Sequence, residues 1–585
     1  MRSRFIAFGI WAIAGIALVL YPTFGLVRLS FRQEDGSFGL GNYSQILAEP
    51  SLLIAAWNSL WTALATTGLC LVFAVPLAFL IARTDMPFKR LVRGASLMTF
   101  IIPNFVAVLG WILLLSPRTG LLNQPFQEWF GLDTGPINIM SPWGIVFCMA
   151  VVMFPLILLP TAAALDNIEV PLEHAAASLG AGRWTVFRKI TVPLIMPAIY
   201  AGCILVFTVS FVAYGPAQLL GGPSRFDNIA TAMLKLTTFP PRIEMAAVLG
   251  IPTIIVLGVL IYLQRVRFGG RSFSIISGKP GQRSLIRLGK WRIPAAILGL
   301  GVVAVTVVLP FGILLLTAFR ETMGNPIGAD NFTLTGNFES ILGQQQIIDA
   351  FRNSFLLSLG AAVLAIAIAM LGAWLVERQK SRASLTIAPV MLLPLAFPGS
   401  VLGIALIIAY GAGFANLAGT LWILLIAYIV GNLPLAFTYL HAGLMQVDRS
   451  LEDAARSLGA GWLTTFRRVT MPLLRGPILV VGVLTFILQF RDLDSSIFLF
   501  NGQNNVIAVI IMSLAAASLY QEVAALSILL LVVSIAAMGV VPLLSWLGRV
   551  NARRAARATI GDVEDRVASE RAPTSRKVDH ASTSV

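Results

Sequence analysis

Long runs of apolar residues, separated by short polar breaks, make up most of the 585-residue chain. A helix that crosses the hydrocarbon core of a bilayer needs roughly 20 mostly apolar residues. Backbone groups inside lipid must find hydrogen bonds within their own segment, so runs of this length indicate helices. We therefore predict about twelve transmembrane helices, six in each half, at residues 5–27, 53–82, 94–116, 143–165, 192–214, 244–264, 292–318, 351–376, 384–410, 417–441, 472–490 and 520–547.

The composition agrees with an all-α polytopic membrane protein. Hydrophobic residues make up 57% of the chain and charged residues 12%, and the mean hydropathy is +0.84. The N-terminal run has the charged beginning of a signal peptide, but it is too long and no small-residue cleavage site follows it. We interpret it as a retained first helix.

The distribution of basic residues predicts the orientation of the chain. Lys and Arg accumulate on the cytoplasmic side of short loops. The segment 265–292 carries eight basic residues and no acid, whereas the loop 319–350 carries one Arg and four acids. An even number of spans with both termini in the cytoplasm satisfies both observations. The net charge of +15 is then mainly a topology signal that also attracts anionic lipid headgroups, and nucleic-acid binding is not expected.

One polar sequence occurs twice in this apolar chain. Residues 173–193 read EHAAASLGAGRWTVFRKITVP and residues 452–472 read EDAARSLGAGWLTTFRRVTMP, which align without a gap. The repeat extends to pairs at a second common offset, Asn58 with Asn353 and Arg83 with Arg378. Two homologous bundles are thus fused in parallel orientation. We predict a first half at 1–264, a basic cytoplasmic linker at 265–291, a second half at 292–547 and a disordered cytoplasmic tail at 548–585.

Each copy of the repeated sequence is predicted to form a helix, a glycine corner and a second short helix in a cytoplasmic loop. Glu173 and Glu452 fall in the first helical turn, where an acid meets the positive end of the helix dipole. Gly180 and Gly459 follow, where glycine can take the left-handed conformation that ends a helix. One narrow apolar face precedes each glycine, formed by Leu172, Ala175, Ala176 and Leu179 and by Leu451, Ala454, Ala455 and Leu458.

A short helix with such a face is suited to lie in a groove of another cytoplasmic protein. The alternative is an interfacial helix that lies on the lipid headgroups. Two copies at matched topological positions favour a partner that is itself two-fold.

The repeated residues resemble a known signature. Glu-x-Ala-Ala, followed four residues later by Gly in a cytoplasmic loop, is similar to the signature of the membrane permeases of bacterial ATP-binding-cassette importers. The matching positions are Glu173, Ala175, Ala176 and Gly180, and Glu452, Ala454, Ala455 and Gly459. The resemblance implies coupling helices that dock on two copies of a cytoplasmic ATP-binding subunit. It also implies a periplasmic substrate-binding protein as a partner and a location in the bacterial inner membrane.

Two copies in one chain resemble the fused permeases of ferric iron and thiamine importers, and also some phosphonate permeases. The stretch YGPAQLLGGPSRFDNIATAMLKL at 214–236 is similar to a segment of the ferric group, so ferric iron is the favoured substrate. Thiamine, a phosphonate and a polyamine remain alternatives. The chain departs from that group where an acid followed by Leu is frequent: it has Arg491-Asp492-Leu493-Asp494 in the second half and Val212-Ala213-Tyr214 in the first.

The sequence does not predict an enzyme. It contains no phosphate-binding loop of the form GxxxxGK[ST], so ATP hydrolysis is assigned to a partner subunit. No Ser-His-Asp or metal-ligand pattern is present, and no cofactor is expected. An ion-coupled secondary transporter is the alternative from a different class. Such proteins usually bury acids near the bilayer midplane, whereas the predicted span interiors here contain almost no ionisable residue.

Five polar residues are candidates for the translocation pathway. Asn58 and Asn353 begin the second and eighth spans, where they either hydrogen-bond across helices or cap the outer interface. Arg491, Asp492 and Asp494 close the eleventh span near its outer end. These three are either ordinary juxtamembrane charges or part of an outer mouth whose acids receive a cationic substrate.

Overall fold

The computed structural model describes residues 2–33, 35–99, 102–168, 176, 178–268, 285–322, 329–379, 382–411 and 416–544. Over these residues the regular elements are helices, and β pairing is limited to three isolated bridges. Nine of the described helices are long and apolar enough to cross a membrane, and two sharply bent pairs raise the number to as many as eleven. The prediction of an all-α polytopic membrane protein is confirmed.

The elements of the two halves follow one another in the same order. The first half contains α1 (Arg2–Gly15), η1 (Ile16–Leu20), α2 (Tyr21–Phe31), α3 (Gly41–Ala48), α4 (Pro50–Arg83), α5 (Lys89–Met98), α6 (Asn104–Leu115), α7 (Gln124–Phe130), α8 (Pro142–Met153), α9 (Pro155–Asp166), α11 (Arg183–Val186), η2 (Phe187–Thr191), α12 (Val192–Phe211), α13 (Tyr214–Pro216), η3 (Ala217–Gly221), η4 (Gly222–Ser224), α14 (Ile229–Thr237) and α15 (Ile243–Phe268). The second contains η5 (Gly289–Trp291), α16 (Arg292–Val303), η6 (Ala304–Val308), α17 (Leu309–Ala318), η7 (Ala329–Asn331), α18 (Gly336–Leu342), α19 (Gln345–Gln379), η8 (Arg382–Thr386), α20 (Ile387–Leu392), η9 (Leu393–Ala396), α21 (Gly399–Tyr410), α22 (Leu421–Met445), α23 (Arg449–Ser457), α24 (Trp462–Thr465), η10 (Phe466–Thr470), α25 (Met471–Leu473), α26 (Arg475–Phe490), α27 (Ser496–Leu499), α28 (Ile507–Ala516) and a last helix, Tyr520–Leu544.

Three of the twelve predicted spans are not single straight helices. The range 94–116 consists of the end of α5 and the short helix α6, and 384–410 is bent by 110° between Ala396 and Gly399. Pro103 and Pro398 are the N-cap residues directly before α6 and α21, and their ψ angles of 141° and 157° are not helical. Proline has no N–H to continue a helix and disfavours helical conformation in the residue before it, which explains both breaks. The eleventh span is bent by 74° at Leu474.

The repeat is visible in local structure as well as in sequence. The π-helices η2 and η10 occupy aligned positions directly before α12 and α25, and η1 and η6 interrupt the first helix of each half. Each π-helix widens the helix locally by one residue, and such bulges are rare enough to indicate a common origin when they coincide.

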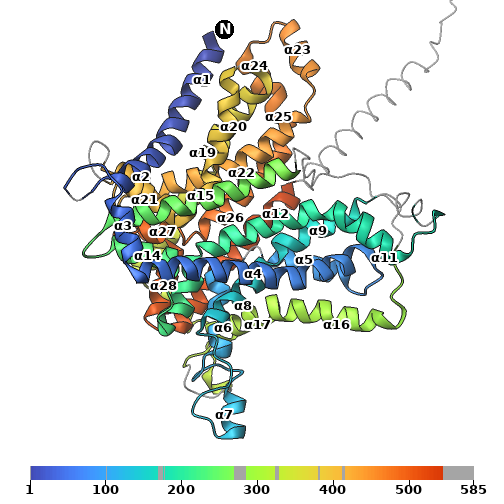
Figure 1. Ribbon diagram of the computed structural model, residues 1–585, viewed down its shortest axis with the longest axis vertical. Coiled ribbons are helices and arrows are strands. Elements are labelled where there is room, and N and C mark those ends of the chain that lie inside the picture. The colour runs from blue at the N-terminus through green and yellow to red at the C-terminus, as the bar shows by residue number, and fades with distance from the viewer. Residues whose placement is uncertain are drawn as a thin grey trace, which may run out of the picture.

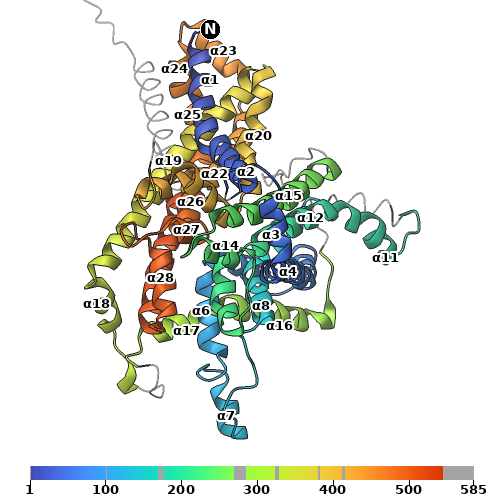
Figure 2. The same cartoon turned by 60° about the vertical axis from the view of Figure 1, so that its left-hand side comes forward.

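The first helix of each half packs on the opposite half. α2 packs against α21, and α1 lies beside α19, whereas α16 and α17 pack against α5 and α6 (Figure 1). The predicted linker 265–291 begins as the last turn of α15, and its residues 269–284 lie outside the described chain. In both views α11 and α23 lie at separate extremities of the molecule (Figure 2).

Candidate functional site

Helix α23 presents an apolar face to solvent. Leu451 and Leu458 are 47% and 89% exposed, and Ala454 is exposed between them. Asp448 is the N-cap residue of this helix and accepts a hydrogen bond from the Ser450 N–H, which lowers the pKa of the Asp448 carboxyl. The N-terminus of the helix is thus capped by Asp448, and its apolar side is exposed in the described structure.

The acid of the repeated sequence is buried on the opposite side of α23. Glu452 is 3% exposed, and its Oε1 accepts hydrogen bonds from Arg378 Nε and Thr470 Oγ1, each at 3.1 Å. Arg378 comes from the last turn of α19 and also donates to the Val447 carbonyl oxygen. Glu452 therefore ties α23 to α19 and to η10, in addition to lying in the first turn of its helix.

Both predicted glycine corners are present. Gly180 and Gly459 each have a φ of +83°. The N–H groups of Ala181 and Ala460, one residue later, donate to the carbonyls of Ala176 and Ala455, at 3.1 and 3.0 Å. This six-to-one bond is the Schellman ending of a helix, and it needs a left-handed residue that glycine adopts without strain.

The first copy of the repeat is only partly described. Glu173 and Ala175 lie outside the described residues, whereas Ala176 and Gly180 lie within them. Leu179 is 89% exposed, the same value as Leu458 in the second copy. The exposed leucine before the glycine is therefore common to both copies.

The acids that follow α26 are engaged within the protein. Asp492 Oδ2 accepts hydrogen bonds from the backbone N–H and the hydroxyl of both Ser495 and Ser496, which fixes the start of α27. Asp494 Oδ1 accepts from the Tyr214 N–H at 3.2 Å, across the boundary between the halves. Arg491 lies beside them, and its Nη1 is buried without a hydrogen-bond partner among the described residues. No group of three or more His, Cys, Asp or Glu in the described chain is arranged to hold a metal ion.

Asn58 and Asn353 make the same contact in the two halves. Asn58 Nδ2 donates to the Asp227 carbonyl at 2.8 Å, and Asn353 Nδ2 donates to the Asn505 carbonyl at 3.0 Å. The serine that follows each asparagine accepts from the first N–H of a short helix: Ser59 from Ile229 at the start of α14, and Ser354 from Ile507 at the start of α28. The asparagines thus hydrogen-bond across helices and hold these two short helices in place.

Replacing Asn353 by Leu is expected to lower the free energy of unfolding by ~1–3 kcal/mol, because the Asn505 carbonyl is left without its buried donor. Thermal unfolding of the purified protein in detergent measures the change. Asn58→Leu is the matched control, and its effect should be smaller because Asn58 is partly exposed. Unchanged thermal unfolding of Asn353→Leu would contradict the structural role.

Sequence reasoning missed two partners of the repeated motif. Arg378 and Glu452 are 74 positions apart, and nothing in a sequence pattern joins them, although the alignment of Arg83 with Arg378 marked this position as repeated. The N-cap role of Asp448 has a sequence signal, because Asp directly before a helical segment is a strong cap. Helix α23 begins directly after this cap, at Arg449.

Comparison with known proteins gives consistent relatives over most of the chain. A probable ABC transporter permease protein of Sinorhizobium fredii is 25% identical over 507 residues, which cover 84% of this chain and 88% of the relative. A ferric transport system permease protein of Actinobacillus pleuropneumoniae is 25% identical over 90% of this chain and 76% of its own length. A spermidine/putrescine transport system permease protein of Escherichia coli is 29% identical over 42% of this chain and 90% of its own.

A solved structure and a family model complete the comparison. The crystal structure of a bacterial ABC transporter involved in alginate import shares 22% identity over 45% of this chain and 93% of the matched chain, with a TM-score of 0.36. The model of the family described as binding-protein-dependent transport system inner membrane component matches twice, at residues 74–272 and 365–555. The two matched ranges do not overlap and together exceed half of the sequence, so the chain belongs to the family of inner membrane components of binding-protein-dependent transport systems.

Proposed function

We propose that the chain is a two-half permease of an ATP-binding-cassette importer and that α23 is one of two docking sites for a cytoplasmic ATPase subunit. The observation that carries the proposal is the construction of α23. Its apolar side, including Leu458, is exposed, whereas Glu452 on the other side is buried against Arg378. An amphipathic helix normally buries its apolar side. In α23 the acid is buried and the leucines are exposed, so the helix can place its apolar side in a groove of a partner.

The two-fold repeat supports two ATPase copies. Leu179 and Gly180 in the first half reproduce the exposure and the backbone conformation of Leu458 and Gly459. Each copy then engages one ATPase subunit, with both termini of the chain in the cytoplasm. A periplasmic binding protein delivers the substrate at the opposite side, as the family description implies.

Docking is tested by copurification of the ATPase with the tagged permease. We expect Leu458→Glu to reduce the retained ATPase at least about tenfold, because a charge is forced into an apolar contact. Leu334→Glu is the control, since Leu334 is 85% exposed in the loop between α17 and α19. Equal retention by both variants would contradict docking at α23.

The aligned segments that follow α12 and α26 meet where the halves join, and we propose that they close the pathway in this conformation. A Cβ added to Gly215 would lie 3.1 Å from Leu493 Cδ2, and the Tyr214 ring lies edge-on to Phe498, with centroids 6.4 Å apart. Transport then requires that the Asp494 to Tyr214 contact opens as the ATPase dimer closes. Arg491, Asp492 and Asp494 are candidate pathway residues at this closure, and Asn58 and Asn353 support it through α14 and α28.

Ferric iron is our proposed substrate. The relative named as a ferric transport system permease aligns with both halves, whereas the spermidine/putrescine relative covers less than half of the chain. The carboxylates of Asp492 and Asp494 lie near the closure, and both already accept protein hydrogen bonds. A cation would therefore meet them only when the closure opens.

The substrate is tested on the cognate binding protein. Calorimetry with ferric salts, thiamine, a phosphonate and a polyamine is expected to show binding of ferric iron alone. Tight binding of an organic ligand, with none for ferric iron, would overturn the substrate and leave the importer mechanism standing.

A further inference from the structure

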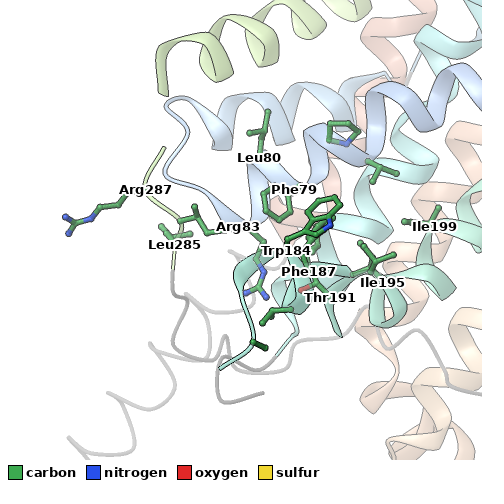
Figure 3. A pocket seen from close by; sticks show the side chains of 17 residues that line it. Phe79, Leu80, Arg83, Trp184, Phe187, Thr191, Ile195, Ile199, Leu285 and Arg287 are labelled. Atoms are coloured by element: carbon green, nitrogen blue, oxygen red, sulfur yellow. The ribbon is translucent and has the colours of Figure 1, made fainter. Parts of the chain in front are cut away.

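A cavity of about 1270 Å³ opens on the first half, between the end of α4 and the start of α12 (Figure 3). Its walls are mainly apolar side chains of α4, α11, η2 and α12, among them Val75, Phe79, Trp184, Phe187, Ile195 and Ile199. Trp184 stacks on Phe187 and is nevertheless 71% exposed. Large exposed apolar surfaces mark sites of interaction with a protein, a ligand or a membrane.

The aligned space in the second half is filled by the protein itself. Phe79 aligns with Trp374, which is 2% exposed and packs edge-on against Trp462 with ring centroids 5.2 Å apart. Met370 and Leu375 are buried, whereas the aligned residues of the first half, Val75 and Leu80, are only half-buried. The fold therefore does not require this cavity, and the difference is specific to the first half.

The end of the inter-half linker forms one rim of the cavity. The Ile286 N–H donates to the Arg83 carbonyl at 2.8 Å, and its carbonyl accepts from the Asp85 N–H at 3.2 Å. The Leu288 N–H donates to Asp85 Oδ1 at 2.9 Å. This pairing fixes Arg287 at the edge of the cavity, exposed and with its side chain directed away from the aromatic residues (Figure 3).

The charged side chains that line the described part of the cavity are basic, and Asp85 is engaged at the rim by the Leu288 N–H. Among the described residues that line it, Arg83 and Arg287 are the charged ones, and none is an acid. Arg188 and Lys189 on η2 are exposed nearby. By the distribution of charge along the chain, this end of α4 faces the cytoplasm.

We propose that this cavity binds an anionic phospholipid of the cytoplasmic leaflet. An acyl chain lies along α4 from Arg83 toward Val75, a length of ~12 Å at 1.5 Å per residue, which is close to the ~15 Å hydrocarbon depth of one leaflet. The phosphate lies at the rim beside Arg287, where basic side chains attract anionic headgroups. The lipid takes the place that Trp374 and Trp462 fill in the second half.

The test uses the full chain in proteoliposomes that contain phosphatidylglycerol or phosphatidylcholine with the same photoreactive acyl chain. Peptides cross-linked after irradiation are mapped by mass spectrometry. We expect peptides from 72–83 and 184–199 to carry about fivefold more phosphatidylglycerol than phosphatidylcholine. Phe79→Trp, which introduces the residue of the second half, should reduce cross-linking of both lipids.

Arg287→Gln tests the headgroup contact without altering the core. This variant is expected to cross-link equally to phosphatidylglycerol and phosphatidylcholine. Arg467→Gln removes the charge of the second half that aligns with Arg188, and it is expected to keep the preference for phosphatidylglycerol. Equal cross-linking of both lipids to the unaltered protein would overturn the proposal. A preference for phosphatidylglycerol that survives Arg287→Gln would also overturn it. Labelling of the Ile199→Cys variant by a membrane-impermeant reagent would show a water-filled space and would overturn it too.

Discussion

Replacing Arg378 by Gln is expected to destabilise the cytoplasmic end of the second half by about 3–5 kcal/mol and to uncouple ATP hydrolysis from transport. The Arg378 and Glu452 side chains are only 6% and 3% exposed, so removing the cation leaves an uncompensated buried carboxylate. Because α23 then loses its ion pair with α19, its apolar side is mispositioned for docking on the ATPase. Thermal unfolding in detergent and uptake in proteoliposomes measure the two effects.

Two further variants distinguish the effect of breaking the buried Arg378–Glu452 pair from the effect of removing any charge. Arg378→Met combined with Glu452→Met should regain most of the stability, because both charges are removed together. Arg456→Gln should change stability by less than ~1 kcal/mol, since Arg456 is 36% exposed and its Nη2 lies 3.8 Å from Glu452 Oε2. If Arg378→Gln unfolds at the same temperature as the unaltered protein, the buried pair does not anchor α23.

The double substitution Gly180→Val and Gly459→Val is expected to abolish uptake at unchanged expression. A residue with a side chain at φ of +83° costs ~1–2 kcal/mol, and a β-branched residue is at the upper end. Space is not limiting, because a Cβ at either glycine meets no atom within 4 Å. The loss would therefore come from the backbone corner alone, and substrate uptake together with ATPase activity reports it.

Gly182 and Gly461 provide the matched control two residues later. A Cβ there also meets open space, and neither residue has a positive φ. Gly182→Val with Gly461→Val should therefore transport normally. Equal loss of uptake in both double variants would show that bulk at this surface, rather than the left-handed corner, is what matters.

Patterns that act over one or two helical turns predicted much of this structure. Apolar runs located nine single helices, and the repeated Gly after Leu179 and Leu458 located both left-handed corners. The breaks at Pro103 and Pro398 had a local signal in the aligned prolines, yet the apolar run continues through each of them. A count of apolar residues therefore predicts one span where a proline divides the chain into two helices.

Interactions between distant segments could not be predicted in the same way. The pairing of Glu452 with Arg378 and of Asp494 with the Tyr214 N–H depends on how helices pack, and the partners are 74 and 280 positions apart. The sequence left the acids after α26 as either ordinary juxtamembrane charges or charges facing a substrate, because it gives the charge of a side chain and not its direction. In the structure Asp492 accepts hydrogen bonds from the N–H groups of Ser495 and Ser496 at the start of α27.

The exchange of first helices between the halves sets an order for biosynthesis. α21 begins about 370 residues after α2 ends, so at ~5–20 residues per second α2 waits roughly 20–70 s in the bilayer before this partner leaves the ribosome, and until then it can pack only on α15 and α3 of its own half. During that time its inward-facing side is available to membrane chaperones and proteases. A gene divided within residues 269–284 should consequently yield stable fragments only when both are made in the same cell, since each fragment carries the helix that completes the other.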